Sequence, residues 1–292
     1  MNYIIFDLEW NNAYNYKTKK GINEIIEIGA LKLNSNLEVV DSFKQLIKPR
    51  LSRKLGSRFK KLTHITIEEI REKGVDFNDA FNDFSRWCGN DDNVFLSWSN
   101  SDLHTLISNF KKFKGTSTIE FMKKYADAQK YCMSFIEGLP DNMNQIGLTN
   151  CAEAFGINID DISFHRALDD CYVTARCFKK VFDEKRFNGY VVKCDFDFFE
   201  RLTFKNYFIS NPVCNDFDIN KQELICPSCK GRVVPVNKYE FLNNTFKNAG
   251  ICESCDKRFW IQIRAKKTYD DIIVTKRLFP VNKKKGKLIN NK

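Results

Sequence analysis

A short apolar segment at residues 4–10, Ile-Ile-Phe-Asp-Leu-Glu-Trp, combines a buried strand with two acidic residues. Side chains alternate along a strand, so Asp7 and Glu9 lie on one face while Leu8 points into the core. Two carboxylates about 7 Å apart along a strand repel each other unless a cation lies between them. The segment is therefore either a strand end that leaves the core with polar residues or one side of a cation site.

The size and composition of the chain fit a globular protein. Its 292 residues are enough for one full domain and a smaller module. Hydrophobic residues make up 43% and include 26 phenylalanines, so a sizeable core is expected. The first apolar run contains two acids, unlike a signal peptide, and no run approaches the roughly 18 apolar residues of a membrane span. We therefore expect a cytoplasmic protein with no membrane partner.

The order of the predicted elements indicates an α/β domain. Three β-rich segments come first, at residues 3–8, 24–33 and 39–47, separated by a polar loop at 11–21 and a turn at 34–36. Apolar periodicity then predicts a helix over 76–88, a strand over 93–98 and helices over 102–113, 149–155 and 165–185. Residues 115–147 fit either a helix or a fifth strand. An antiparallel meander followed by alternating strands and helices predicts a mixed sheet flanked by helices.

Charge and composition divide the chain further. We expect the α/β domain over residues 1–186, a connector over 187–222, a cysteine-bearing module over 223–282 and a basic tail over 283–292. The net charge is +10, and a second basic run, which we expect to form a loop at residues 48–61, has seven basic residues and no acid. Such runs suit a polyanion, most often nucleic acid, although a simple solvated charge run is the alternative.

Two more acidic positions and a histidine stand near predicted strand ends or helix starts. Asp102 follows the strand at 93–98, while His165 precedes the last helix and Asp170 lies in its first turns. Because open α/β sheets gather functional groups at strand ends, Asp7, Glu9, Asp102 and Asp170 can meet in one cleft. Oxygen ligands of this kind suit Mg²⁺ or Mn²⁺. Singly, each acid could instead be a helix cap and His165 a capping or core histidine.

The ordered set resembles a known family. Phe6-Asp7-Leu8-Glu9, Asp102 before a helix, and His-x-Ala-x-x-Asp at 165–170 are similar to the DEDDh family of 3′→5′ exonucleases, which share the ribonuclease H-like fold. The resemblance covers residues 1–185 and includes intermediate segments at 23–30, 62–66 and 148–156. With its small cysteine module, the chain is also similar to bacterial predicted exonucleases described as inhibitors of a sporulation-kinase pathway.

The resemblance implies a fold, an activity and a set of site residues. The fold would be a ribonuclease H-like mixed sheet flanked by helices, and Asp7, Glu9, Asp102 and Asp170 would hold two Mg²⁺ or Mn²⁺ ions. His165 would act as general base, and nucleoside 5′-monophosphates would leave the 3′ ends of single-stranded RNA or DNA. The alternative is a non-catalytic nucleic-acid- or protein-binding regulator built on an exonuclease scaffold.

Substrate contacts are expected beside the first motif. Trp10 directly follows it, and bases stack well on aromatic rings. Leu62 and Thr63 occupy the stretch that lines the terminal nucleotide in the relatives that the chain resembles. For Glu24 and Glu27, on the second strand, we expect solvent exposure or pairing with lysine, with a supporting role at the metal site as the alternative.

Four of the eleven cysteines form two CxxC pairs, Cys226 with Cys229 and Cys252 with Cys255, separated by 22 residues. Matched pairs predict one structural zinc ion held by four thiolates, with redox chemistry as the alternative. A hairpin around Asn243-Asn244 and strands at 259–263 and 272–274 would complete a zinc ribbon, which could bind nucleic acid or a protein partner. The other seven cysteines are expected to be mostly small buried hydrophobes.

Overall fold

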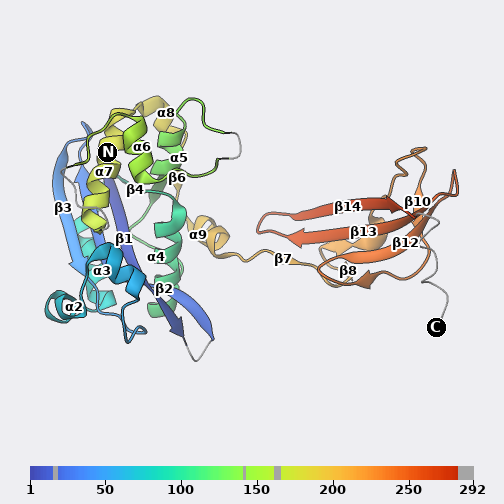
Figure 1. Cartoon of the computed structure of the whole chain (residues 1–292), viewed down its shortest axis with the longest axis horizontal. Helices are drawn as coiled ribbons and strands as arrows, with labels where there is room; N and C mark the ends of the chain where they lie inside the picture. Colours follow the sequence, from blue (N-terminus) through green and yellow to red (C-terminus); the bar gives the residue numbers. More distant parts are fainter. Residues whose placement is uncertain (16–18, 141–142, 161–165, 282–292) are drawn as a thin grey trace. The chain divides into compact units, whose positions relative to one another are not determined.

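A computed structural model describes residues 1–15, 19–140, 143–160 and 166–281 of the chain (Figure 1). The chain divides into two compact units, Met1–Thr203 and Phe204–Lys292. This boundary falls inside the connector predicted over residues 187–222, so part of that segment belongs to each unit.

The first unit is built around a six-stranded sheet with the strand order β3-β2-β1-β4-β5-β6. Its strands are β1 (Asn2–Asn15), β2 (Lys20–Leu33), β3 (Val39–Leu46), β4 (Asn93–Ser97), β5 (Lys124–Asp127) and β6 (Val192–Lys193). The first three strands pair antiparallel, β1 with β4 and β4 with β5 pair parallel, and β6 returns antiparallel. The predicted meander and mixed sheet are therefore confirmed, and the ambiguous stretch before residue 130 supplies the fifth strand.

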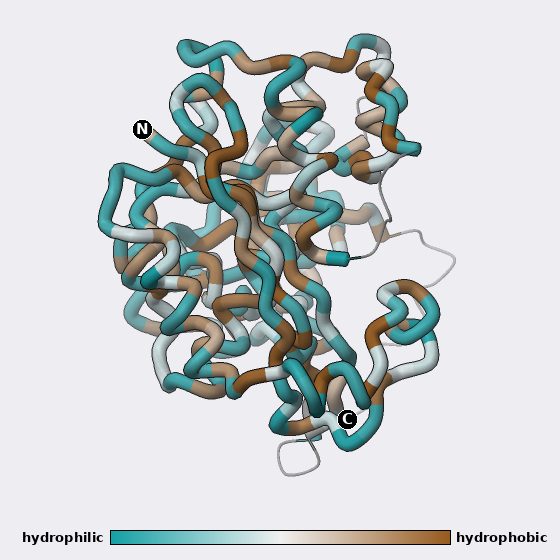
Figure 2. Tube along the Cα trace, turned by 90° about the vertical axis from the view of Figure 1, so that its left-hand side faces the viewer, coloured by the Kyte–Doolittle hydropathy of each residue, from teal (hydrophilic) through white to brown (hydrophobic). Residues whose placement is uncertain are grey.

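Helices cover both faces of this sheet. The helices of the first unit are α1 (Ser57–Thr63), α2 (Ile67–Lys73), α3 (Phe77–Cys88), α4 (Asn100–Phe113), α5 (Ala128–Met133), α6 (Leu148–Ala154), α7 (Ala167–Lys180), α8 (Glu184–Asn188) and α9 (Phe196–Thr203). One core joins the sheet to α3, α4 and α9, and a second joins its other face to α5, α6, α7 and α8. Hydrophobic stretches accordingly concentrate in the central strands (Figure 2).

Alternation along β1 determines which side chains meet which layer. Ile4, Phe6 and Leu8 enter the core with α3 and α4, whereas Tyr3 and Ile5 enter the core with α7. Asp7 and Glu9 continue the series of Tyr3 and Ile5, so they lie on the face that α7 covers. The apolar pattern of one strand thus directs both acids toward one helix.

Three local predictions were wrong. Within the stretch 11–21 that was predicted as a loop, residues 11–15 and 20–21 instead continue the β1–β2 hairpin, because their backbone groups pair in register as far as Asn15 and Lys20. The basic run 48–61 contains the start of α1, whose Phe59 is buried. The helix predicted over 165–185 ends at Lys180, as α7. A separate helix, α8, begins at Glu184, and the side chain of Asp183 caps its start by accepting the Arg186 N–H.

A close approach between β2 and α7 depends on Gly29. A β-carbon at this position would stand 2.2 Å from the backbone nitrogen of Leu168 and 2.4 Å from the carbonyl carbon of Ala167. Gly29 lies opposite Asp7 in the β1–β2 register, and its carbonyl accepts a contact from the Cys171 thiol at 3.4 Å. Only glycine lets the first turn of α7 reach the strand pair at this point.

The second unit is a β-sheet module. Its strands are β7 (Tyr207–Phe208), β8 (Val213–Cys214), β9 (Phe217–Asp218), β10 (Val233–Pro235), β11 (Glu240–Phe241), β12 (Phe246–Cys252), β13 (Arg258–Lys267) and β14 (Ile272–Pro280), with a short 3₁₀ helix η1 (Ile219–Lys221). The main path runs β10-β12-β13-β14. Asn243 and Asn244 have φ of +53° and +55° in the turn between β11 and β12, as the predicted hairpin requires.

In the part of the chain that the structure describes, every helix is too short or too polar to cross a bilayer.

Replacing Gly29 with alanine is expected to destabilise the first unit. The added carbon forces the backbone of α7 away from β2, and overpacking of this kind costs about 1–3 kcal/mol. The free energy of unfolding, measured by urea titration followed by circular dichroism, should fall by that amount. Gly21→Ala is the matched control, since its new carbon would have its nearest neighbour 3.9 Å away. Equal stability of both variants would contradict the close approach.

Candidate active site and metal centre

Asp7 and Glu9 reach the α7 side of the sheet next to an irregularity in β2. In the β1–β2 ladder Glu9 lies opposite Glu27, but Trp10 lies opposite Ile25, so β2 carries one extra residue, Ile26. Such a bulge changes the direction in which the side chains after it point. Both acids are half-buried where the two strands bend.

Asp170 joins these acids from α7. One oxygen each of Asp7, Glu9 and Asp170 can be chosen so that all three lie within 4.8 Å of one another. Asp170 sits in the first turn of α7, where its backbone N–H bonds the carbonyl of Arg166 at 3.1 Å. Oxygen ligands on opposite sides of one Mg²⁺ ion stand roughly 4.2 Å apart, so this donor set fits a hard divalent cation.

Asp102 lies outside that group of three but beside it. It is only 4% exposed, and its Oδ1 accepts the backbone N–H of Leu8, between the two acids of β1, at 3.1 Å. The cap of α4 is Ser99 and not Asp102, which removes the simplest alternative role of this carboxylate. The pairing of β1 with β4 ends at Ile5 and Leu96, so the Leu8 N–H is available for this bond.

The crowded acids resist ionisation. Burial, followed by the charges of Asp102 and Asp170, holds the pKa of Asp7 well above its usual range. Burial and Asp170 raise the pKa of Glu9 to about 8, and burial raises that of Asp102 to about 7 against hydrogen bonds that lower it. The ionised form of the cluster therefore needs positive charge nearby.

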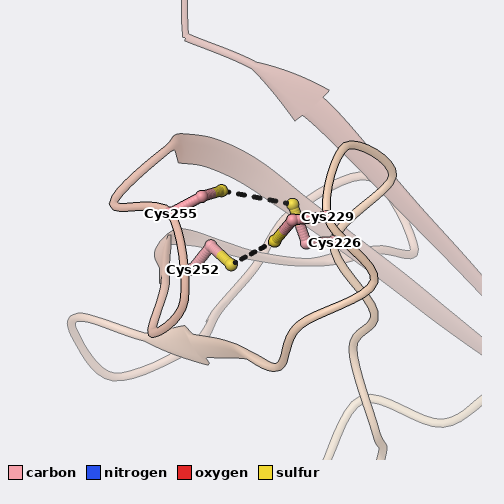
Figure 3. Close-up of side chains that lie close together, drawn as sticks. All are labelled: Cys226, Cys229, Cys252 and Cys255. Carbon is pink, nitrogen blue, oxygen red and sulfur yellow. Dashed lines mark hydrogen bonds between the residues drawn. The ribbon is translucent and has the colours of Figure 1, made fainter.

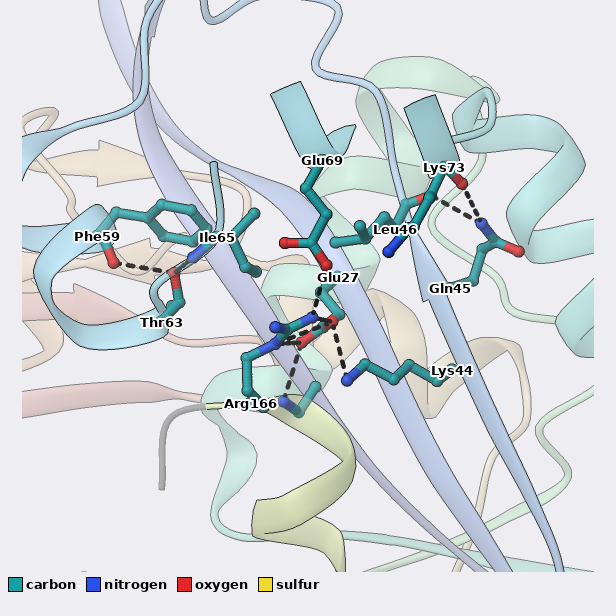
Figure 4. Close-up of polar contacts among 11 residues, drawn as sticks. Glu27, Lys44, Gln45, Leu46, Phe59, Thr63, Ile65, Glu69, Lys73 and Arg166 are labelled. Atoms are coloured by element: carbon teal, nitrogen blue, oxygen red, sulfur yellow. Dashed lines mark hydrogen bonds and ion pairs between the residues drawn. The ribbon is translucent and has the colours of Figure 1, made fainter. Parts of the chain in front are cut away.

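The residue predicted as general base, His165, lies outside the described residues. Its neighbour Arg166 is described and forms an ion pair with Glu27 on β2 (Figure 4). The guanidinium donates three hydrogen bonds of 2.5–3.2 Å to the Glu27 carboxylate, which also accepts the backbone N–H of Ala167 at 3.2 Å. Glu27 therefore fixes the backbone between positions 165 and 170 against the sheet.

A second buried glutamate, Glu24, fixes the basic segment. Its carboxylate accepts the backbone N–H groups of Arg50, Leu51 and Ser52 at 2.6–2.8 Å. Asn11 on β1 extends this anchor, because its amide accepts the Gly56 N–H and donates to the Ser52 hydroxyl, both at 2.8 Å. The buried side chains of Glu24 on β2 and Asn11 on β1 thus hold residues 50–56 against these two strands.

The expected solvent exposure of Glu24 and Glu27 was wrong, since they are 1% and 0% exposed. The bulge at Ile26 changes the alternation of β2, so both side chains turn inward. The expected pairing with lysine is present in part, as Lys44 stands 3.7 Å from Glu27. Arg166 and Asn11 were missed as site-forming residues, whereas a supporting role for Glu24 and Glu27 was the alternative expectation; the signal for it was two acids inside an otherwise apolar strand.

The three predicted substrate residues line one pocket. Trp10, Leu62 and Thr63 share it with Glu9 and Arg58, and its volume is about 420 Å³, within the range of roughly 300–1,000 Å³ typical of ligand sites. Leu62 is exposed, whereas Thr63 is buried and its hydroxyl donates to the Phe59 carbonyl at 3.0 Å. The pocket therefore opens directly beside the acidic group.

The four paired cysteines meet in the second unit (Figure 3). Their sulfur atoms all lie within 4.8 Å of one another, with Cys226–Cys255 at 3.8 Å and Cys229–Cys252 at 3.4 Å. Four thiolates about 2.3 Å from one tetrahedral zinc stand roughly 3.8 Å apart, so the donor set fits zinc. The predicted grouping of these residues is confirmed.

The two CxxC segments share one backbone shape. The residue after each pair, Lys230 or Asp256, has a positive φ, and its N–H bonds the carbonyl of the first cysteine at 3.0 Å. Burial opposes ionisation of Cys226, but N–H groups of Cys229 and Ser228 outweigh it and lower the pKa of this thiol to about 6. Of the other seven cysteines, six are buried as expected and Cys214 is exposed.

The chain is similar to known exonucleases over most of its first unit. The family model described as Exonuclease (RNase_T) matches residues 4–178. A DNA polymerase III PolC-type from Thermotoga petrophila is 31% identical over 157 residues, which are 54% of this chain and 10% of the polymerase. The chain thus spans about a tenth of the length of the PolC-type relatives it matches. The probable 3′-5′ exonuclease KapD from Bacillus subtilis is 25% identical over 181 residues, 59% of this chain and 80% of that protein.

A solved structure shares the fold. The nuclease domain of 3′hExo, a DEDDh family member, bound to rAMP, has a TM-score of 0.51 and 22% identity, over 61% of this chain and 90% of that one. The ribonuclease H-like mixed sheet expected from the sequence is confirmed by this likeness and by the strand order. This chain therefore belongs to the exonuclease family, with a ribonuclease H-like first unit and a C-terminal four-cysteine cluster that fits a zinc ribbon.

Proposed function

We propose that this chain is a metal-dependent 3′→5′ exonuclease that releases nucleoside 5′-monophosphates from single-stranded RNA or DNA. The observation that carries the proposal is the convergence of Asp7, Glu9 and Asp170 within 4.8 Å, beside the buried Asp102. The 3′→5′ direction is supported by the KapD relative, whose name includes it.

Asp7, Glu9, Asp102 and Asp170 would together hold two Mg²⁺ or Mn²⁺ ions. When bound, such ions supply charge stabilisation for the scissile phosphate and lower the pKa of an attacking water. The raised pKa values of Glu9 and Asp102 support this role, because a resident cation is what keeps buried acids ionised near neutral pH.

The remaining residues of the site would bind and orient the substrate. His165 would take the proton of the attacking water, and the Glu27–Arg166 pair fixes the backbone next to it. The pocket beside Glu9 would take the terminal nucleotide, with its base against Trp10 and its wall formed by Leu62 and Thr63. Arg58, in the same wall, is placed to pair with a phosphate.

The cysteine cluster would hold one structural zinc ion. Four thiolates leave no open coordination position, so we assign it no part in the reaction. Its role would be to stabilise a small unit whose own core comes from strands β9, β10, β12, β13 and β14, the short helix η1 and the loops around them.

Asp7→Asn and Asp170→Asn should each slow digestion by at least about 100-fold, because each removes a metal-binding carboxylate. The measurement is product length over time on a 5′-labelled single strand with Mn²⁺, where 3′→5′ digestion gives a ladder of shortening labelled products. Asp169→Asn, one residue away on α7 and outside the acidic group, is the matched control and should digest at the normal rate. Normal turnover by Asp170→Asn would refute the assignment.

Stability without divalent cations should fall as pH rises from about 4.5 to about 8. In this window Glu9 stays protonated when folded but loses its proton when unfolded, so the folded state binds more protons and higher pH favours unfolding. Added Mg²⁺ should therefore raise the melting temperature more near pH 8 than near pH 4.5, as measured by differential scanning calorimetry. Glu9→Gln should weaken both trends; an Mg²⁺ effect that is independent of pH would contradict the account.

The purified chain should contain about one zinc ion, and Cys226→Ser should lose it. Zinc content is measured by mass spectrometry of the metal, with thermal unfolding of the second unit as the stability readout. Cys214→Ser, which changes an exposed cysteine outside the cluster, should keep its zinc. A metal-free second unit that remains folded would overturn the zinc assignment.

A further inference from the structure

One face of the second unit's sheet is exposed and has no described role. Along β13, Phe259, Ile261 and Ile263 are buried in the core, so the residues between them point to the opposite side, which we call the outer face. On β14, Ile272, Val274 and Leu278 pack against the same core, so the alternate positions from Ile273 to Phe279 also belong to the outer face.

Two exposed aromatic residues occupy neighbouring positions on this face. Trp260 on β13 is directly opposite Phe279 on β14, and the two are 42% and 43% exposed. Residues directly opposite in an antiparallel pair have side chains on the same side of the sheet, about 4.5–5.5 Å apart at their β-carbons. Both rings are therefore presented to solvent from neighbouring positions on one face, where burying either ring in the core would have been the ordinary outcome.

Positive charge surrounds the aromatic pair. The outer face carries Arg258, Arg264 and Lys266 on β13, Arg277 on β14 and Lys247 on β12. Among the described residues of β12, β13 and β14, outer-face positions hold no carboxylate. One acid of this face is Glu240 on β11, which lies opposite Lys247 on β12. Strand β11 pairs with β12 on the side away from β13, so Glu240 is away from the aromatic pair.

We propose that the outer face is a binding surface for single-stranded nucleic acid, with bases stacked on Trp260 and Phe279 and phosphates paired with the surrounding cations. Adjacent aromatics within a basic surface are the arrangement that binds unpaired strands, because every base has a face that stacks and every linkage carries a negative charge. A protein partner fits less well, because five cations with no carboxylate at the outer-face positions of β12, β13 and β14 surround the rings, and charged residues are depleted at the centres of protein interfaces. Duplex DNA fits less well too, because its bases are already stacked on each other.

This surface would retain the substrate strand. It rests on the proposed function only in taking nucleic acid as the substrate, and it assigns that class of ligand to the second unit. A second binding unit on the same chain keeps a strand at high local concentration while its 3′ end is shortened. The proposal needs no particular arrangement of the two units.

Binding is measured by fluorescence anisotropy with labelled oligothymidylate and oligouridylate of about 20 nucleotides, longer than the ~4–16 nucleotides that one OB fold covers. The full chain carries Asp170→Asn in every sample, which prevents digestion, and keeps its lysine-rich residues 283–292. Because no turnover is needed, a failure of the nuclease proposal leaves this measurement valid.

Trp260→Ala combined with Phe279→Ala should weaken binding of both oligonucleotides at least about tenfold, because each ring stacks a base. Trp260→Phe keeps an aromatic ring and should bind within about twofold of the parent chain. Arg277→Ala should reduce the slope of log affinity against log salt by about 0.7, the value for one single-strand phosphate contact. Tyr207→Ala is the control: this residue is 55% exposed, and its register with Lys267 places it on the other side of the sheet.

Each result of these binding measurements either contradicts or supports the proposal. Unchanged binding by the double aromatic variant, with its zinc retained, would overturn the proposal and leave the face to a protein partner. An equal loss in Tyr207→Ala, or an equal loss for a duplex of the same length, would overturn stacking on the outer face. Loss of binding in the double variant with retention in Trp260→Phe supports it.

Discussion

Repulsion among carboxylates that the fold forces together is the constraint around which the first unit is organised. Asp7 and Glu9 share a face of β1, and Asp170 arrives from α7 within 4.8 Å of both. Burial and mutual repulsion raise the pKa of each β1 acid, so keeping these acids ionised in the folded chain costs free energy. The hydrogen bond from Leu8 to Asp102 offsets only part of this cost.

The polar residues around the site have two different roles. Glu27 is fully buried, yet its charge is neutralised by Arg166, so it belongs to the scaffold that fixes α7 rather than to the cation site. Glu24 receives three backbone N–H groups and fixes the basic segment in the same manner. Gly29 completes the arrangement, because its missing side chain allows α7 to lie directly on β2. Glu24 and Glu27 thus stabilise the scaffold, whereas Asp7, Glu9 and Asp170 form the group that fits a cation.

Local patterns explain how much of this could be predicted. Alternation in residues 4–10 placed Asp7 and Glu9 together, helical spacing placed Asp170 in the first turn of α7, and CxxC spacing grouped the four cysteines. A bulge is a property of two paired strands, so the extra residue Ile26 has no signal in one strand alone, and two acids inside an otherwise apolar strand do not by themselves show that both turn inward. The alignment of Trp260 with Phe279 likewise depends on a register that the turn between β13 and β14 sets. The role of His165 remains a prediction, since it lies outside the described residues.

The central claim is that these acids bind divalent ions as one set. Electron paramagnetic resonance of Mn²⁺ tests it directly, because free Mn²⁺ gives a strong signal that binding removes. The account predicts saturable binding of two Mn²⁺ ions per chain near neutral pH, lost in Asp7→Asn and kept in Asp169→Asn. Unsaturable binding, or binding that Asp7→Asn leaves intact, would contradict it.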